Sequence, residues 1–170
     1  MTTSMEVNGD PLLRVEGLVV DFATPSGAAH VVEDLSFELS AGETLCIAGE
    51  SGSGKSVTAL SLMGLLPKPS GRIAAGKAWF EGKDLLALPE RAMAAIRGND
   101  IAMIFQEPMT SLNPILSIGR QLTEGPIRHL GLSRAAAEQR AVEMLDAVRI
   151  AEPKRRLRQY PHELSGGMRQ

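Results

Sequence analysis

The stretch GESGSGKS at residues 49–56 decides the fold class of this chain. It fits the pattern G-x-x-x-x-G-K-[ST] of a phosphate-binding loop, with Gly49, Gly54, Lys55 and Ser56 in the defining positions. Small residues let successive backbone N–H groups point inward around a triphosphate, and the helix that starts there adds the positive end of its dipole. In such a loop, Lys55 reaches the β- and γ-phosphates, and the hydroxyl of Ser56 ligates Mg²⁺.

The residues on either side of this loop predict an α/β fold. The run TLCIAG at 44–49 is continuously apolar, which is typical of a short strand buried on both faces of a sheet. A helix is predicted to follow over 54–66. An ordinary glycine-rich turn is the alternative interpretation, and the order strand, loop, helix favours the phosphate-binding loop over it. The same strand predicts that Cys46, the only cysteine, is a buried and reduced thiol.

The N-terminal part of the chain has the pattern of an antiparallel sheet. Residues 1–10 are polar and are predicted to form a mobile tail. Period-two alternation with β-branched residues predicts two antiparallel strands, which begin near Leu12 and near His30 and are separated by a turn. Further along, the patterns predict strands at 77–81 and 100–105, and a short helix at 89–96.

From Ser117 onward the pattern is helical. Ser133 is in position to cap a helix. The apolar residues of that helix are predicted to form one stripe: Ala137, Ala141, Met144, Leu145 and Val148. The second half therefore predicts a small helical layer.

Composition excludes some classes of partner and selects none. The 170 residues carry 18 basic and 20 acidic side chains, a formal net charge of −2, which is too balanced to indicate a duplex nucleic acid or an anionic membrane surface. The N-terminus lacks the pattern of a secretory signal, and no run approaches 18 consecutive apolar residues. The expectation is a cytosolic protein.

Two further stretches carry chemistry. In FQEPMTSLNP at 105–114, Gln106 has an amide whose oxygen can ligate a hard cation and whose NH₂ can position a water. In LSGGM at 164–168, Ser165 can cap a helix, and the two glycines that follow it allow close approach of the backbone to phosphate. Taken alone, the first is compatible with a loop hydrogen bond and the second with an ordinary turn.

The three motifs in this order resemble those of the ATP-binding subunit of ABC transporters. The resemblance runs from Leu12 to Gln170, with 49–56 matching the Walker A motif, Gln106 the Q-loop and LSGGM the family signature. The longer stretches GESGSGKSV, IFQEPMTSLNP and YPHELSGGMRQ resemble the oligopeptide and dipeptide importer subgroup, which also includes nickel and glutathione importers. Within that subgroup, the residue types at three positions resemble those of the D-type paralogue: Val57, Met109 and Met168.

This resemblance implies a fold of the α/β class. It is a P-loop NTPase core of the ABC-ATPase type, with an antiparallel β subdomain and a helical subdomain at about 108–165. Residues 11–170 would be part of such a nucleotide-binding domain. In the family the chain continues into a strand with the Walker B aspartate and the catalytic glutamate, then the D-loop and a switch histidine. Residues 1–170 alone are therefore expected to be inactive as an ATPase.

The resemblance also assigns site residues. The residues implied to contact ATP are Gly49, Glu50, Ser51, Gly52, Ser53, Gly54, Lys55, Ser56 and Val57. Phe22 is the ring implied to stack on adenine, and His30 is the second candidate. Lys55 and Gln106 are the implied catalytic residues, and Ser56 and Gln106 the implied ligands of Mg²⁺. The signature residues implied to face the ATP held by a partner subunit are Ser165, Gly166 and Gly167.

The implied function is to energise import of peptides or related small solutes by ATP binding and hydrolysis in a head-to-tail dimer. The implied partners are a second ATP-binding subunit, either a paralogue or a second copy, and integral membrane permease subunits, with a substrate-binding protein acting indirectly. The protein would lie in the cytoplasm, peripheral on the inner face of the cell membrane. Two alternatives stay open at this point: an ATP-binding fragment that does not hydrolyse, and a different P-loop enzyme such as a small-molecule kinase.

Overall fold

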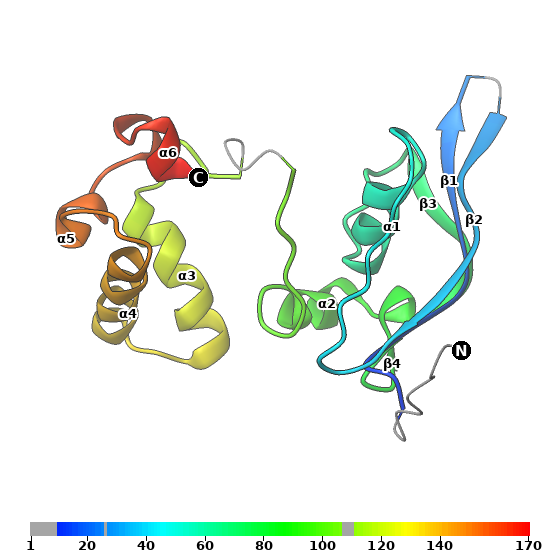
Figure 1. Ribbon diagram of the computed structural model, residues 1–170, viewed down its shortest axis with the longest axis horizontal. Helices are drawn as coiled ribbons and strands as arrows, with labels where there is room; N and C mark the ends of the chain where they lie inside the picture. Colours follow the sequence, from blue (N-terminus) through cyan, green and yellow to red (C-terminus); the bar gives the residue numbers. More distant parts are fainter. Residues whose placement is uncertain (1–9, 26, 107–110) are drawn as a thin grey trace, which may run out of the picture. The chain divides into compact units, whose positions relative to one another are not determined.

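The computed structural model describes residues 10–25, 27–106 and 111–170. The chain divides into two compact units, Met1–Ala94 and Ala95–Gln170. Figure 1 shows strands and the helix α1 in the first unit, and helices in the second.

The first unit is built on a four-stranded antiparallel sheet with the order β2-β1-β3-β4. Its strands are β1 (Leu13–Thr24), β2 (Gly27–Leu39), β3 (Gly71–Phe80) and β4 (Lys83–Asp84). The predicted antiparallel pair is confirmed as β1 and β2, which pair from Leu13↔Leu39 to Thr24↔Gly27. The strand predicted at 77–81 is confirmed as the end of the longer β3. A 3₁₀ turn, Leu85–Ala87, and the predicted short helix, α2 (Glu90–Ile96), follow the sheet.

Helix α1 (Lys55–Leu62) contacts β1 and β2 of this sheet (Figure 1). It ends earlier than predicted, because Gly64 adopts a left-handed φ of 61° just after the C-cap Met63. The N–H of Leu65 donates to the carbonyl of Leu60 at 2.8 Å, and the N–H of Gly64 donates to that of Ser61 at 3.0 Å. These two bonds form a Schellman motif, so the glycine, rather than the later prolines, stops the helix.

The core of the first unit includes side chains of β1, the strand that pairs with β2 on one side and with β3 on the other. Val15, Leu18 and Val20 are fully buried there. The register of β1 shifts on both sides of Leu18, and β3 approaches it closely at Gly76, whose φ is 102°. A Cβ at Gly76 would lie 2.6 Å from the carbonyl oxygen of Gly17 and 2.6 Å from Cα of Leu18. Only glycine fits this contact between two backbones.

Asp21 ties three strands together. Its Oδ1 accepts a hydrogen bond from Nδ1 of His30 on β2 at 2.6 Å, and its Oδ2 accepts one from Nη2 of Arg72 on β3 at 2.8 Å. Asp21 is buried, and burial alone raises the pKa of its carboxyl. The hydrogen bonds and positive charges of His30 and Arg72 outweigh that effect, so the pKa of Asp21 lies below its ordinary value.

Replacing Asp21 by asparagine is expected to make unfolding less sensitive to acid. The folded-state pKa of Asp21 is lowered, so its carboxylate stabilises the fold above the unfolded pKa of about 3.9, and this stabilisation is lost as the pH falls towards the folded value. The urea midpoint, followed by the fluorescence of the single tryptophan, Trp79, should fall more in the wild type than in Asp21→Asn below about pH 5. The matched control is Asp34→Asn, an exposed position of β2 with a φ of 46°, which asparagine tolerates. Equal losses in wild type and Asp21→Asn would contradict this role.

The second unit is helical. Its helices are α3 (Ile118–Leu130), α4 (Arg134–Ala147), α5 (Pro153–Arg156) and α6 (Gly166–Arg169), with a 3₁₀ turn at Pro161–Glu163. Ser133 caps α4 as predicted, because its Oγ accepts a hydrogen bond from the N–H of Ala136. The backbone of α3 meets the segment after α5 at Gly119, where a Cβ would lie 2.7 Å from the carbonyl oxygen of Leu157.

The predicted apolar stripe of α4 is too wide. Ala137, Ala141 and Leu145 are buried, which follows an i, i+4, i+8 row. Met144 and Val148 are exposed, so placing them in the buried stripe was wrong. A helix residue is buried only where a neighbouring element covers it, and on α4 that cover is limited to the row of Ala137, Ala141 and Leu145.

Two predicted strands are absent from the described residues. Residues 44–49 have no strand pairing, Leu45 and Ile47 are 41% and 44% exposed, and Cys46 is exposed rather than buried. At 100–105 the pairing is limited to one isolated bridge between Arg97 and Ile101. A strand in the middle of a sheet is stabilised by ladders on both sides and by cover on both faces, and an apolar sequence does not supply these by itself.

Candidate nucleotide-binding site

The loop at 49–55 is held in shape by glycines in left-handed conformations. Gly52 and Gly54 have φ values of 84° and 85°. Gly54 is buried and lies against β2, because a Cβ there would be 2.6 Å from the carbonyl oxygen of Val31 and 3.0 Å from Cγ2 of Val32. Only glycine combines this backbone conformation with this close approach. The antiparallel sheet thus fixes where α1 begins.

The side chain of Lys55 folds back into the loop. Its Nζ donates to the carbonyl oxygens of Gly49 and Glu50, each at 2.7 Å, and to Oγ of Ser53 at 3.1 Å. All three ammonium protons are therefore satisfied by the loop itself. This geometry keeps a positive charge at the loop before any ligand arrives, and an anion entering the loop can take over some of those hydrogen bonds.

The N-terminus of α1 is open to an anion. No side chain caps it, and the first turn contains no acidic residue. The first N–H groups of a helix have no partner within the helix, and together with the dipole they favour a negative charge. Ser56 is exposed in this turn, and Val57 is half-buried.

Thr58 supports the start of α1 next to the loop, and the sequence motif does not mark it. It is buried, and its Oγ1 donates to the carbonyl oxygen of Gly54 at 3.1 Å. The backbone N–H of Thr58 donates to the same oxygen at 2.8 Å. The signal was available in the sequence, because a threonine four residues after Gly54 can bond back to its carbonyl in a helix.

The two candidate rings for adenine have different surroundings. Phe22 is half-buried on β1, where its Cζ would lie 3.2 Å from a Cβ at Gly71. The ring therefore packs over the bare backbone of a glycine. His30 is 57% exposed at its side chain, and its Nδ1 is occupied by Asp21. Both rings stay candidates.

The remaining predicted site residues, and Met109 of the subgroup resemblance, belong to the second unit. Gln106 is exposed, and Met109 lies outside the described residues. Ser165 caps α6 as predicted, since its Oγ accepts a hydrogen bond from the N–H of Met168 at 3.4 Å. Gly166 and Gly167 are exposed, with nothing within 4 Å of an added Cβ. The signature residues thus form a short capped helix start with open space beside its glycines.

The loop, its inward lysine and the open helix start define a P-loop nucleotide-binding fold. The model of the ABC transporter family matches residues 32–170, so the chain belongs to the ABC transporter family.

Similar proteins include transport ATP-binding proteins from several bacteria. The chain is 55% identical to the oligopeptide transport ATP-binding protein OppD of Salmonella typhimurium, over 94% of this chain and 47% of that protein. It is 50% identical to the dipeptide transport ATP-binding protein DppD of Bacillus subtilis, over 95% of this chain and 48% of that protein. It is 53% identical to the peptidoglycan transport ATP-binding protein YejF of Agrobacterium fabrum, over 97% of this chain and 30% of that protein. The chain spans about half or less of the length of these relatives.

A solved structure shares the fold. The ATP-binding cassette MJ0796 bound to ADP and Pi superposes with a TM-score of 0.74 at 22% identity, covering 92% of this chain and 65% of that one. The predicted fold class is confirmed: an ABC-ATPase type of α/β fold with an antiparallel sheet and helices. Within the described ranges, no helix is long and apolar enough to cross a membrane.

Proposed function

We propose that this chain is the nucleotide-binding part of an ATP-driven importer subunit for peptides or related small solutes. The observation that carries the proposal is the ammonium group of Lys55, held inside a glycine-rich loop at an uncapped helix start. The names of the similar proteins, an oligopeptide and a dipeptide transport ATP-binding protein, support peptides as the cargo and the D-type subunit as the paralogue. The match to the ABC transporter family runs to Gln170 and includes the signature, which removes the support for a small-molecule kinase.

The loop would bind the triphosphate of ATP. The N–H groups of residues 50–57 surround the phosphates, and the N-terminus of α1 adds its dipole. Lys55 contributes a mobile positive charge to the β- and γ-phosphates. Phe22 supplies the ring for adenine in this proposal, and His30 is the second candidate.

Mg²⁺ is the cofactor that these residues suit. Ser56 offers a hydroxyl and Gln106 an amide oxygen, both exposed and both hard oxygen donors of the kind that Mg²⁺ accepts. One or two protein ligands are sufficient, because phosphates and waters complete the shell of this ion. When bound, the ion supplies charge neutralisation for phosphoryl transfer. Gln106 would orient the attacking water through its NH₂ group.

The signature residues would act on a second subunit. Ser165, Gly166 and Gly167 present N–H groups and open space, which suits the γ-phosphate held by a paralogue or a second copy. Binding of ATP closes such a dimer, and hydrolysis reopens it. We place the complete subunit on the inner face of the cell membrane, attached through permease subunits, with a substrate-binding protein acting indirectly. Residues 11–170 are then part of the nucleotide-binding domain, with its helical subdomain at about 108–165.

The function is tested by reconstituting the complete subunit with its permease in vesicles and measuring uptake of labelled peptides. ATP is expected to drive uptake, and ADP is not. ATP binding and hydrolysis without uptake of any peptide would contradict the cargo assignment.

Replacing Gln106 by alanine in the complete subunit is expected to lower the rate of ATP hydrolysis by about tenfold or more, because a water and an ion lose an oriented partner. The affinity for ATP should change by less than about threefold, because the phosphate loop is intact. Kd is measured with a fluorescent ATP analogue and kcat by phosphate release. Gln139→Ala, an exposed glutamine of α4, is the matched control. A large loss of affinity with a normal kcat would count against this role.

A further inference from the structure

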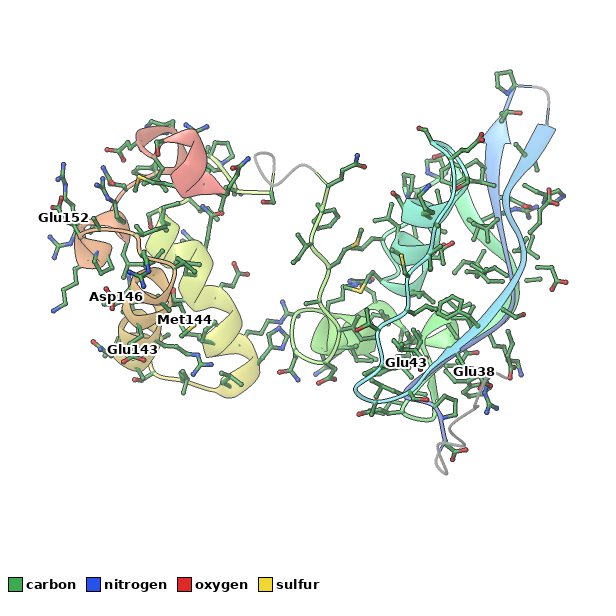
Figure 2. The ribbon with its side chains drawn as sticks, viewed as in Figure 1. Glu38, Glu43, Glu143, Met144, Asp146 and Glu152 are labelled. Atoms are coloured by element: carbon green, nitrogen blue, oxygen red, sulfur yellow. The ribbon has the colours of Figure 1, made fainter. Side chains whose placement is uncertain are left out.

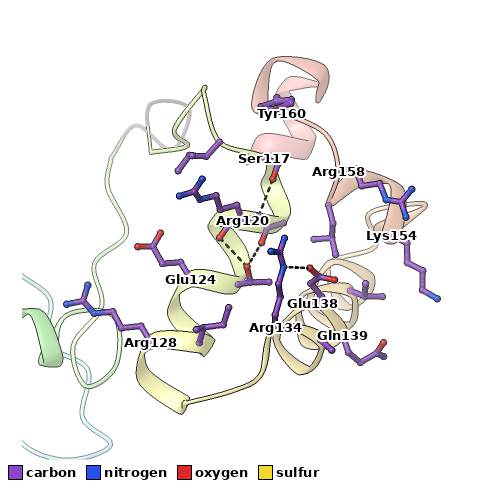
Figure 3. Close-up of a pocket in the computed structure, with 17 residues that line it drawn as sticks. Ser117, Arg120, Glu124, Arg128, Arg134, Glu138, Gln139, Lys154, Arg158 and Tyr160 are labelled. Atoms are coloured by element: carbon purple, nitrogen blue, oxygen red, sulfur yellow. Dashed lines mark hydrogen bonds and ion pairs between the residues drawn. The ribbon is translucent and has the colours of Figure 1, made fainter.

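The groove between α3 and α4 in the second unit does not focus charge on one ligand, because the charged ends of Arg120, Lys154 and Arg158 point away from one another (Figure 3). The first unit holds a different feature close to the phosphate-binding loop. This feature is the ring of Phe22 together with the glycine backbone on which it packs. The surroundings of the ring decide how it can meet a nucleobase.

The register of the sheet brings Phe22 near the loop. Val20 pairs with Val32 on β2, and Cγ2 of Val32 would lie 3.0 Å from a Cβ at Gly54, the N-cap of α1. Phe22 follows two residues later on the same face of β1, because side chains alternate and residues 20–22 pair with β3 without a shift. At about 3.3 Å per residue, the step along the strand is about 7 Å. A ligand whose phosphates lie in the loop can therefore bring its base to the ring.

The ring of Phe22 packs on the neighbouring strand and stays half-buried. On β3 it pairs with Gly71, where a Cβ would lie 3.2 Å from Cζ and 3.3 Å from Cε1 of the ring. On β2 it pairs with Ala29, which is small and exposed. Because both cross-strand neighbours are small, the ring lies against bare backbone on one side and keeps surface for a planar ligand.

The backbone at Gly71 is fixed by the turn that precedes it. The N–H of Gly71 donates to the carbonyl oxygen of Pro67 at 2.7 Å, and Oγ of Ser70 donates to the same oxygen at 3.2 Å. The carbonyl oxygen of Ser70 accepts from the N–H of Ala23, the residue after Phe22, at 2.8 Å. A Cβ at Gly71 would also lie 3.2 Å from the oxygen of Pro67. This hydrogen-bonded turn resists displacement, so a side chain added at residue 71 moves the half-buried ring instead.

We propose that Gly71 is the positioning residue of the base site: its lack of a side chain sets the place and the tilt at which the ring of Phe22 meets adenine. The inference rests on the proposed function, since it takes ATP as the ligand of the loop. It separates the base from the phosphates. A side chain at residue 71 weakens binding of the base through the ring and leaves binding of the phosphates unchanged.

Two ligands separate these contributions in the complete subunit: ATP and inorganic tripolyphosphate, each with Mg²⁺. Kd for ATP is measured by calorimetry, and Kd for tripolyphosphate by displacement of ATP. In Gly71→Val, a stiff side chain that suits a strand pushes the ring away, and Kd for ATP should rise by about tenfold. Gly71→Ala should raise it by about two- to threefold, because a single methyl group displaces the ring less. Kd for tripolyphosphate should change by less than about twofold in both variants, because the loop is intact.

A double-mutant cycle then tests whether the effect acts through the ring. Phe22→Ala alone should raise Kd for ATP by about tenfold, which is typical of a base stacked on an aromatic side chain. Adding Gly71→Val to Phe22→Ala should change Kd by less than about twofold further, because no ring is left to displace. The matched control is Ala75→Val, an exposed position of the same strand, which should bind both ligands like the wild type. Melting curves are recorded for all variants, and Gly71→Ala gives the decision where Gly71→Val is unfolded.

The outcomes separate this inference from the proposed function. Equal weakening of both ligands by the variants at Gly71, or unchanged ATP binding in a folded Gly71→Val, overturns the inference while ATP-driven uptake can still stand. A loss of ATP affinity in His30→Ala in place of Phe22→Ala overturns it as well, because His30 is then the ring that meets adenine. A wild-type subunit that binds neither ATP nor tripolyphosphate overturns the proposed function and the inference together.

Discussion

Replacing Lys55 by alanine in the complete subunit is expected to weaken ATP binding by about a hundredfold or more and to abolish ATP hydrolysis. Hydrogen bonds to charged groups each contribute about 1.5–3 kcal/mol, and the loss of two of them corresponds to about 3 kcal/mol or more, which is about a hundredfold in Kd. The loop also loses the three hydrogen bonds from Nζ that join Gly49, Glu50 and Ser53. The loss of the bonds to phosphate and the loss of the bonds within the loop both weaken binding of ATP.

The measurement is a titration with a fluorescent ATP analogue, followed by phosphate release. Lys83→Ala is the matched control, because Lys83 is an exposed lysine on β4 of the same unit. It should leave both quantities unchanged. Unchanged affinity and turnover in Lys55→Ala would remove the assignment of the phosphate-binding loop.

Replacing Gly54 by alanine is expected to destabilise the first unit by about 3 kcal/mol and to weaken ATP binding by more than about tenfold. A left-handed φ costs a residue with a Cβ about 1–2 kcal/mol, and an overpacked contact costs about 1–3 kcal/mol more. At Gly54 both apply, since φ is 85° and the new Cβ would lie 2.6 Å from the carbonyl oxygen of Val31. Relief requires α1 and β2 to move apart, which displaces the loop.

Gly52→Ala is the control that separates the two costs. Gly52 has nearly the same φ, 84°, but nothing lies within 4 Å of an added Cβ. It should cost only the conformational part, about 1–2 kcal/mol. Urea unfolding followed by the fluorescence of Trp79 gives both values. Equal losses for the two variants would show that the contact with Val31 does not matter.

Figure 2 shows the side chains of the two units, and two of the residues that it labels, Glu43 and Met144, illustrate what local sequence decides and what it does not. Glu43 illustrates the local case: it follows β2, and its Oε2 accepts a hydrogen bond from the N–H of Ser40, three positions before it. Met144, labelled on α4, illustrates the other case, because whether an apolar helix residue is buried depends on the neighbour that covers it.

The candidate site was largely predictable from sequence. The residues that shape the loop, from Gly49 to Ser56, are contiguous, and their conformations follow from glycine geometry and helix capping. Thr58 was missed although its bond to Gly54 is equally local. The predictions of strands at 44–49 and 100–105 were wrong because they depend on distant residues: an apolar run becomes a strand only when other strands pair with it.

By itself, the sequence determined the phosphate-binding loop, the hairpin of β1 and β2, and the caps of α4 and α6, because each depends on residues within a few positions of one another or on a single turn. Three contacts were decided only by the tertiary structure. Asp21 bonds to Arg72, which lies 51 positions further along the chain. The other two are close backbone approaches, of Gly54 to Val31 and of Gly119 to Leu157. The physical reason is strand register and helix packing. A shift of one residue in β3 would turn Arg72 to the other face of the sheet, and no local pattern records which register has the lower free energy.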